Sequence, residues 1–178
     1  MSQLRVPVSS RDHVAGGPSA VVTLVEYGDY QCPHCAAALP HVQRVHAHFG
    51  ARLALVYRHF PLSEIHPHAV IAAQVAEFAG DNGLFWDMHE AIFLNQRRLN
   101  PTVLLALAST LGLSQVQLRD AIRRGQYLDK ISADFMGGVR SGVNGTPTFF
   151  INGERHHGTY AAQDLIAVIN AAVSAPAI

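Results

Sequence analysis

The chain has 178 residues, of which 49% are hydrophobic, and its 13 Lys and Arg residues balance its 13 Asp and Glu residues. This length predicts one domain with room for an insertion, and the hydrophobic content is ample for a sizeable core. Zero net charge predicts neither nucleic acid nor a membrane surface as partner. No apolar run is long enough to span a bilayer. Residues 1–20 lack an apolar signal-peptide core, so we expect a cytoplasmic protein unless a leader has been removed.

The first third of the chain predicts a strand, a helix and a second strand. An edge strand is expected around Leu4–Val8, and the apolar run 21–27 predicts a buried strand. The Ala-rich segment 36–49 predicts a helix, which Pro40 should kink. Residues 52–60 alternate as a second strand, which should run parallel to the first after the helical crossover.

The middle of the chain has helical periodicity throughout. Ser114, followed three residues later by Gln117, resembles a capping box at the start of one of these helices. Aromatic and Met residues in this block are interpreted as core rather than as a cofactor site. The predicted helices cover residues 69–79, 85–95, 103–111, 114–125 and 127–139.

The last part of the chain predicts a hairpin followed by a helix. Residues 146–151 read as a strand, Asn152-Gly153 is a strong hairpin signal, and 154–157 should return antiparallel. Pro147, at the start of a strand, is a place where a cis peptide bond can occur. Residues 161–173 predict a closing amphipathic helix. The whole pattern predicts an α/β protein, a mixed sheet with helices on both faces.

Cys32 and Cys35 are the only cysteines, and they form Cys-Pro-His-Cys between a strand and a helix. At a helix start, unpaired N–H groups and the helix dipole favour a thiolate, so Cys32 is the predicted nucleophile. Cys35, one turn further and less exposed, is the predicted resolving thiol. Pro33 suits an early helical position, and a protonated His34 would further stabilise the thiolate. This arrangement predicts a redox dithiol.

A metal site and a structural disulfide are the alternatives for this motif. Zinc normally takes four ligands, and the chain has no second cysteine pair. The eleven histidines keep a metal site open, but His41, His46 and His48 contain no i,i+4 pair, and His156 and His157 should face opposite sides of a strand. A structural disulfide would close too small a loop to constrain the unfolded chain. We therefore predict no metal and no cofactor. The same surface or capping interpretation covers His66 and His68.

Glu26 is a charged residue inside an apolar strand, six residues before Cys32. A buried carboxylate is costly, so it needs a partner or a function. A raised pKa would let it exchange a proton with Cys35. The alternatives are a strand end that reaches solvent or an ion pair, for which Arg58 is a candidate partner. His59 and His66 are candidates for positive charge at the edge of the site.

Three motifs resemble DsbA-type thioredoxin-fold proteins, and the resemblance covers nearly the whole chain. It implies a thioredoxin fold with a helical insertion after the second βα-unit strand. The implied domains are 1–62 with 127–178 for the thioredoxin-like part and 63–126 for the insertion. The motifs are Val-Glu-Tyr-Gly-Asp-Tyr-Gln-Cys-Pro-His-Cys, then Tyr-Arg-His-Phe-Pro-Leu, then Gly-Val-Asn-Gly-Thr-Pro-Thr-Phe-Phe-Ile-Asn-Gly.

The resemblance also implies roles for single residues. Cys32 would be the nucleophile, Cys35 the resolving cysteine and Glu26 the buried acid. Pro147 would be the cis-proline that faces the dithiol, and the backbone of Thr146 would pair with an extended substrate segment. Tyr30, in the loop before the motif, completes the expected substrate-binding set.

The sequence therefore predicts a thiol–disulfide oxidoreductase acting on protein or small-molecule thiols. Its direction stays open, because Pro-His between the cysteines resembles the oxidising relatives, whereas a cytoplasmic location favours reduction. Glutathione or a thioredoxin system is a candidate recycling partner. The alternatives are an enzyme like the kappa-class glutathione transferases or isomerases, and a metal-handling or chaperone-like binding module.

Overall fold

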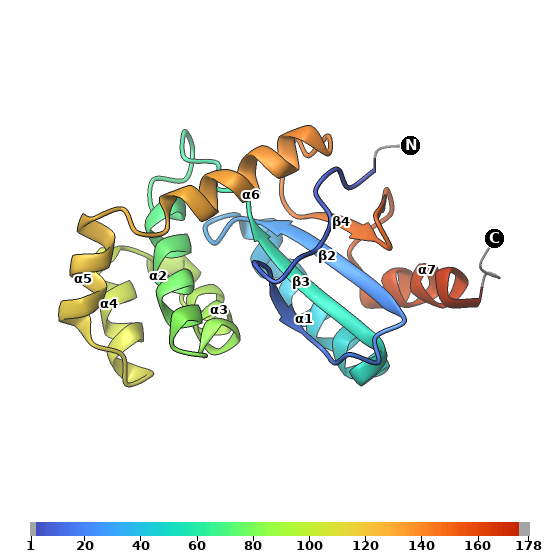
Figure 1. Cartoon of the computed structure of the whole chain (residues 1–178), viewed down its shortest axis with the longest axis horizontal. Coiled ribbons are helices and arrows are strands. Elements are labelled where there is room, and N and C mark those ends of the chain that lie inside the picture. Colours follow the sequence, from blue (N-terminus) through green and yellow to red (C-terminus); the bar gives the residue numbers. More distant parts are fainter. Residues whose placement is uncertain (1–2, 175–178) are drawn as a thin grey trace.

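A mixed sheet of order β1-β3-β2-β4-β5 forms the centre of the computed structural model, which describes residues 3–174. As predicted, β2 and β3 run parallel (Figure 1). Strand β4 pairs with the other side of β2 and is antiparallel to it. The chain thus places its first predicted strand in the middle of the sheet. The strands are β1 (His13–Ala15), β2 (Val22–Gly28), β3 (Leu53–His59), β4 (Thr148–Ile151) and β5 (Glu154–Arg155).

The predicted helices are all present, and their ends agree with the predictions to within about one turn. Ser114 caps its helix as expected, because its hydroxyl accepts a hydrogen bond from the Gln117 N–H at 3.3 Å. The helices are α1 (Pro33–Phe49), α2 (Ala69–Asp81), α3 (Phe85–Leu94), α4 (Pro101–Thr110), α5 (Gln115–Arg123), α6 (Leu128–Arg140) and α7 (Ala162–Ser174), with short 3₁₀ turns η1 (Gly50–Arg52) and η2 (Gln96–Arg98).

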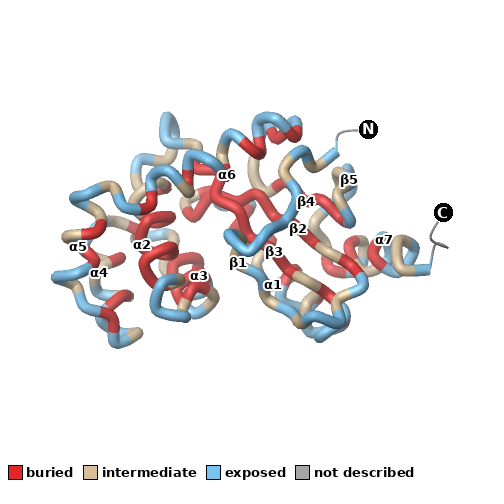
Figure 2. Tube along the Cα trace, in the orientation of Figure 1, coloured by how far each residue is buried: buried red, intermediate tan, exposed pale blue. Residues whose placement is uncertain are grey.

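Side chains alternate between two cores on the two faces of the sheet. Leu24 on β2 faces the core made with α1 and α7, whereas its neighbour Val25 faces a core that includes Phe135 of α6. This period of two is what a strand covered on both faces requires. Figure 2 shows the resulting buried band along β2 and β3.

Helices α2 to α5 form a block beside one end of the sheet, joined to α6, which crosses above the sheet (Figure 1). Their apolar side chains share one core cluster with Tyr30, Cys32 and Cys35. The helical block therefore packs directly against the Cys-x-x-Cys segment. The boundaries predicted for the insertion, after residue 62 and before residue 127, stay a prediction. Residues 1–2 and 175–178, which the thioredoxin-like part was predicted to include, lie outside the described residues.

The expected edge strand at Leu4–Val8 is wrong. This segment makes isolated contacts with the hairpin, an antiparallel bridge from Gln3 to Glu154 and a Leu4 N–H bond to the Gly153 carbonyl of 2.8 Å. Pro7 lacks the N–H that a continuing strand needs. The edge strand is instead β1, which pairs antiparallel with β3. The return strand β5 is also shorter than predicted and ends at Arg155.

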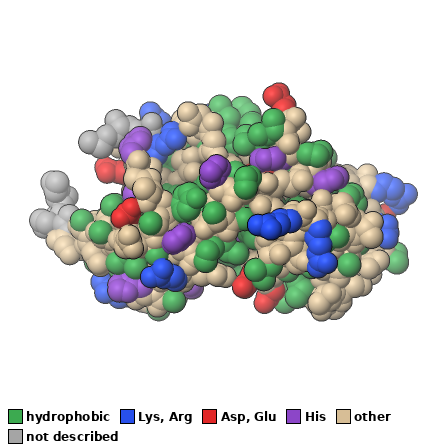
Figure 3. Space-filling view, turned by 180° about the vertical axis from the view of Figure 1, so that it is seen from behind, with side chains coloured by type: hydrophobic (Ala, Val, Ile, Leu, Met, Phe, Trp, Pro, Cys, Tyr) green, Lys and Arg blue, Asp and Glu red, His purple; other side chains and the backbone are tan. Residues whose placement is uncertain are grey.

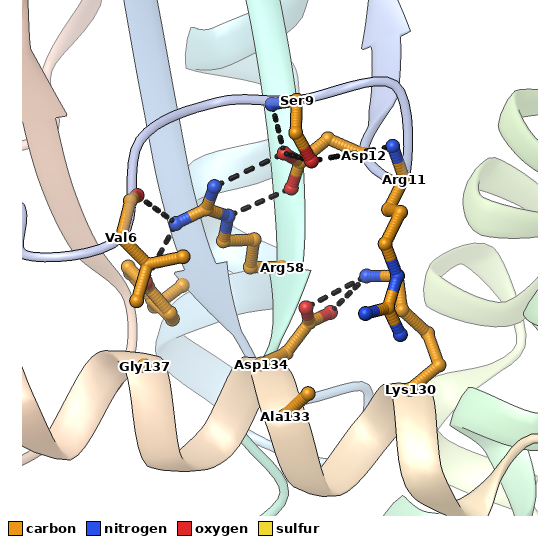
Figure 4. Close-up of a pocket in the computed structure, with 10 residues that line it drawn as sticks. Val6, Ser9, Arg11, Asp12, Arg58, Lys130, Ala133, Asp134 and Gly137 are labelled. Carbon is orange, nitrogen blue, oxygen red and sulfur yellow. Dashed lines mark hydrogen bonds and ion pairs between the residues drawn. The ribbon is translucent and has the colours of Figure 1, made fainter.

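Arg58 is buried and does not pair with Glu26, contrary to the sequence-based interpretation. Its guanidinium donates to Asp12 at 2.7 and 3.0 Å and to the carbonyl oxygen of Val6 at 2.8 Å (Figure 4). Strand register explains the difference: Glu26 is paired with Tyr57, so the next residue, Arg58, points to the opposite face. Arg58 therefore holds the segment 6–12 against the sheet through these hydrogen bonds.

Candidate active site at the start of α1

The Cys-x-x-Cys motif forms the first turn of α1. Cys32 is the N-cap residue, Pro33 occupies the first turn, and no side chain caps the helix. The Cys32 N–H donates to the Asp29 carbonyl oxygen at 3.1 Å, and the Cys32 carbonyl accepts from the N–H groups of Cys35 and Ala36. The first N–H groups of the helix consequently lie beside the Cys32 sulfur, where a negative charge is favoured.

The pKa of Cys32 falls from 9.0 to about 5. The largest cause is a hydrogen bond from the Cys35 thiol, which outweighs the opposing effect of burial. The Thr146 side chain and the backbone N–H groups of Cys35 and His34 lower the pKa further. The His34 side chain itself is exposed. Cys32 is therefore almost entirely a thiolate at pH 7, which makes it the competent nucleophile in disulfide exchange.

Cys35 has the opposite electrostatic environment. Its side chain is fully buried, and burial, followed by the hydrogen bond to Cys32, raises the pKa of its thiol well above 9.0. The Asp29 N–H lies 3.4 Å from its sulfur and only partly offsets that effect. Cys35 thus holds its proton at neutral pH. Both cysteines are reduced in this structure.

Glu26 lies beneath the motif, on the face of β2 that α1 covers. It is paired across the sheet with Tyr57 and Phe149. Burial, and to a smaller extent the charge of Cys32, raises the pKa of Glu26 from 4.5 to about 8. The charge of Glu26 in turn contributes to the raised pKa of Cys35. The two groups are therefore electrostatically coupled.

A cavity of about 210 Å³ borders Glu26. His46 Nε2 and the Tyr57 hydroxyl are both buried without a hydrogen-bond partner within the described protein, and both residues line this cavity. Polar atoms in a cavity of this size are normally satisfied by water. Water there would connect Glu26 with the protein surface. The exposed residue Glu90 lies on the same lining.

Thr146 and Pro147 approach the dithiol from the loop before β4. Their peptide bond is cis, and the thiol form of Cys32 donates to the Thr146 carbonyl oxygen at 3.3 Å. The Thr146 hydroxyl is buried and has no hydrogen-bond partner among the described residues. Both residues are only half-buried. The structure thus brings Thr146 and Pro147 to the nucleophile from more than a hundred residues away.

Tyr30 is not available to a substrate, so its predicted role is corrected. Its side chain is 1% exposed, packs against Tyr57 and Phe93, and places its hydroxyl 3.1 Å from His89 Nδ1. The helical block supplies His89 and Phe93, and sequence reasoning had no means to place them over this loop. Burial also lowers the pKa of His89 to about 3, so this histidine is neutral.

Two residues that position the motif were missed by the sequence analysis. Asp29 is buried, and its carboxylate accepts from the N–H groups of Gln31 at 2.7 Å and Leu62 at 2.8 Å. Gln96, on η2, donates to the carbonyl oxygens of Tyr30 and Cys32, each at 2.9 Å. A polar residue between a buried strand and the motif was a usable signal for Asp29. No local signal pointed to Gln96.

The histidines proposed at the edge of the site have different positions. His66 Nδ1 lies 2.8 Å from the Asp29 carboxylate, so this residue supports the loop before the motif. His59 is buried and shares one oxygen of Glu77 with His13, at 2.8 and 2.9 Å. His59 therefore forms an internal contact between the sheet and α2 and does not lie at the edge of the site, where the sequence had suggested it.

One cluster in the described part of the chain has metal-ligand spacing, and it contains none of the histidines in the predicted surface set. His59, Glu77 and Asp134 each place one ligand atom within 4.8 Å of the others. Lys130 occupies both carboxylate oxygens of Asp134 at 2.6 and 2.7 Å, as Figure 4 shows. Glu77 is held by His13 and His59. These internal bonds account for the cluster without a metal.

The chain matches the family model described as "Thioredoxin" over residues 9–171. A thioredoxin-like oxidoreductase from Silicibacter pomeroyi is 27% identical and superposes with a TM-score of 0.81, over 94% of this chain and 95% of that one. Oxidised BdbD from Bacillus subtilis is 20% identical, with a TM-score of 0.86 over 95% and 96%. This chain belongs to the thioredoxin family. Its fold is also that of alpha-DsbA1 from Wolbachia pipientis, which is 23% identical and superposes with a TM-score of 0.81 over 96% of this chain and 94% of that one.

Curated relatives are longer proteins. The Na(+)/H(+) antiporter NhaA 1 of Salinispora arenicola is 45% identical over 172 residues, and the antiporter NhaA 3 of Salinispora tropica is 41% identical over 170 residues. Each match covers 95% of this chain but 26% of the relative. The chain thus spans about a quarter of the length of these relatives, and ion transport is a property named for those whole proteins.

Among residues 3–174, no helix combines the length and apolar character needed to cross a membrane.

Proposed function

We propose that this protein donates its Cys32–Cys35 disulfide to the thiols of other proteins. The observation that carries the proposal is the opposite pKa of the two cysteines, about 5 for Cys32 and far above 9.0 for Cys35. A thiolate that is stable at neutral pH stabilises the reduced form of the dithiol. An enzyme whose reduced form is stabilised is a strong oxidant.

The size of this stabilisation supports the oxidising direction. A fall of the Cys32 pKa from 9.0 to about 5 lowers the free energy of the reduced form at pH 7 by about 3 kcal/mol. For a two-electron couple this corresponds to a rise in potential of about 60 mV. The shift is directed from the thioredoxin value, near −270 mV, toward the DsbA value, near −120 mV.

The chemical steps follow from the geometry. A substrate thiolate attacks the Cys32 sulfur, the Cys32–Cys35 bond breaks, and Cys35 leaves as a thiolate. Glu26, which is largely protonated at pH 7, gives its proton to Cys35. A second substrate thiolate then attacks the substrate sulfur of the mixed disulfide. Cys32 leaves as the stable thiolate, so the substrate is oxidised and the dithiol reduced.

Substrates would be held through their backbone. Thr146 and Pro147 are half-exposed beside the Cys32 sulfur, and main-chain groups at this point can pair with an extended segment as in strand addition. Because backbone pairing does not depend on side chains, many substrate proteins could be accepted. A second partner must reoxidise the dithiol after each turnover, and glutathione disulfide has the required chemistry.

The redox equilibrium of Cys32 and Cys35 with glutathione tests the proposal. We expect a potential at least about 60 mV above that of thioredoxin, in the direction of the DsbA value. A potential near that of thioredoxin would contradict a disulfide donor and favour a reductant.

Two variants test the assigned roles of the cysteines. Cys32→Ser should abolish thiol oxidation, and Cys35→Ser should accumulate mixed disulfides with substrate proteins, detected on non-reducing gels. Full catalytic activity of Cys35→Ser would instead favour a single-nucleophile enzyme, such as a kappa-class glutathione transferase or isomerase relative.

A further inference from the structure

Two cavities adjoin groups that contact Cys32. Its carbonyl oxygen accepts a hydrogen bond from Gln96, which lines a cavity of about 270 Å³. Its sulfur contacts Thr146, next to Pro147, which lines a cavity of about 230 Å³. The first cavity is lined by Ala36 and residues 93–98, and the second by residues 147–149, 155–158 and Tyr160.

The first cavity carries two arginines with no acidic partner. Arg97 and Arg98 are exposed, and neither forms an ion pair among residues 3–174. Arg98 donates instead to the neutral Asn95 side chain at 3.0 Å. Because Gln96 is hydrogen-bonded to the carbonyl oxygens of Tyr30 and Cys32, the segment that carries these two arginines is held against the backbone of the motif.

The second cavity has the same electrostatic character. Arg155 donates to the Gly142 carbonyl and to the Asn144 side chain, both neutral groups. His156 and His157 lie on the same lining. None of the described residues that line either cavity is Asp or Glu, although the chain as a whole contains as many acidic as basic residues. The two cavities beside Cys32 are therefore locally cationic.

The space-filling view agrees with this distribution. On the face seen in Figure 3, basic and His side chains lie among hydrophobic ones, and the acidic side chains lie mostly toward its edges. A surface of this kind attracts negatively charged partners and slows positively charged ones.

We infer that these two cavities receive acidic side chains on either side of the reacting cysteine in an extended substrate segment. This inference rests on the proposed function and specifies its substrate class. A protein segment is favoured over a small thiol because the two cavities share no lining residue and adjoin Cys32 through different groups, Gln96 at its carbonyl and Thr146 at its sulfur. Residues before and after a cysteine in an extended chain can reach two such places at once.

The reaction used for the test needs no added redox partner. The Cys32 thiolate of the Cys35→Ser protein attacks one sulfur of a disulfide-linked peptide dimer. The peptide disulfide breaks, a Cys32–peptide bond forms, and one peptide leaves as a thiolate that takes up a proton. One disulfide is consumed and one is formed, so the step is balanced.

Three peptides that differ only in charge would measure the preference. Each carries one cysteine, with Glu, Gln or Lys two residues before and two residues after it, and each rate is divided by the rate with dithiothreitol to remove differences in intrinsic reactivity. An exposed ion pair is worth at most about 1 kcal/mol, or about fivefold. We expect the Glu peptide to react about two- to fivefold faster per ion pair than the Gln peptide, and the Lys peptide to react more slowly. Salt at 0.5 M should reduce the difference.

Variants assign the preference to the cavities. Two variants are made in the Cys35→Ser background, the double variant Arg97→Gln/Arg98→Gln and the single variant Arg155→Gln. In each of them, the rate with the Glu peptide divided by the rate with the Gln peptide should move closer to one. Arg119→Gln is the matched control, because Arg119 lines a groove on the helical block. It should leave the ratio unchanged.

The other outcomes overturn one conclusion or the other. Equal rates for the three peptides, or a ratio that the three arginine substitutions leave unchanged, would overturn the inference and leave the proposed function standing. The variants could instead react more slowly with glutathione disulfide and at an unchanged rate with the Glu peptide. That result would assign the cavities to a small thiol and overturn the inference. Failure of every peptide to form a mixed disulfide would overturn the proposed function itself.

Discussion

Cys32 and Cys35 are three residues apart, yet the surroundings of Cys32 stabilise its thiolate and those of Cys35 destabilise it. Around Cys32, the hydrogen bond from the Cys35 thiol, the Thr146 side chain and helix N–H groups bring the pKa to about 5. Around Cys35, burial and nearby negative groups raise the pKa well above 9.0. Glu26 belongs to this second region, because burial also raises its pKa, to about 8.

This difference separates two tasks. The start of α1 stabilises a thiolate on Cys32 for attack on a partner, whereas burial keeps the proton on Cys35. Both residues are buried, Cys32 at 5% and Cys35 at 1% exposure. The contrast therefore depends on the hydrogen bonds that the Cys32 sulfur accepts as well as on the burial of Cys35.

The largest expected effect concerns the pH dependence of stability. The raised pKa of Glu26, from 4.5 to about 8, contributes stability that is present below pH 4.5 and is lost as the pH rises to about 8, in total about 5 kcal/mol. The lowered pKa of Cys32 has the opposite sign: its contribution is present above pH 9 and is lost as the pH falls through about 5. The lowered pKa of His89, from 6.5 to about 3, adds stability as the pH rises to 6.5 and offsets the Glu26 effect below that pH. Between pH 6.5 and 8 the free energy of unfolding should therefore fall in the oxidised protein but stay nearly level in the reduced one.

Urea unfolding of both redox forms across pH 6.5–8 would measure this difference. The oxidised Glu26→Gln variant is the control and should lose most of the slope. Parallel slopes in the oxidised and reduced wild-type protein would contradict the assignment of opposite pKa values to the two regions.

The next effect is on proton transfer. Glu26→Gln should slow the steps in which Cys35 gains or loses its proton by about a hundredfold at pH 7, since general acid–base catalysis commonly contributes at least that factor. The alkylation rate of Cys32 should change little. Stopped-flow measurement of disulfide exchange would show this, with Glu90→Gln as the matched control at the exposed edge of the same cavity. Equal slowing by both variants would argue against Glu26 as the proton carrier.

A smaller effect should follow when the hydrogen bond between the two cysteines is removed. Hydrogen bonds to charged groups are worth about 1.5–3 kcal/mol, so Cys35→Ala should raise the Cys32 pKa by about one to two pH units. Cys35→Ser, which keeps a donor, should restore part of the difference. The pH dependence of iodoacetamide alkylation measures both values. An unchanged pKa in Cys35→Ala would assign the stabilisation to the helix N–H groups alone.

The smallest effect is expected at Thr146. Its hydroxyl is buried without a hydrogen-bond partner among the described residues, and the Thr146 side chain contributes less than Cys35 to the lowered pKa of Cys32. Thr146→Val should therefore raise that pKa by less than Cys35→Ala does, whereas Thr146→Ser should leave it near the wild-type value. A larger rise with Val than with Cys35→Ala would reverse the order of the two hydrogen bonds.

Local patterns in the sequence predicted the elements of this fold well. The helix that starts at the cysteines, the parallel pair β2 and β3, and the Ser114 cap all follow from periodicity and capping rules that act over a few residues. The predicted edge strand failed because pairing at an edge depends on which segment the sheet leaves room for, and this is not a local property.

The sequence by itself determined the dithiol, its place at a helix start and the charged residue in the strand beneath it. These follow from the chemistry of single residues and their spacing along the chain. Only the tertiary structure decided that Arg58 pairs with Asp12, that Tyr30 is buried, and that Gln96 reaches Cys32 from a distant segment. Burial and hydrogen bonds between distant residues set pKa values, and they exist only after the sheet and the helical block have packed together.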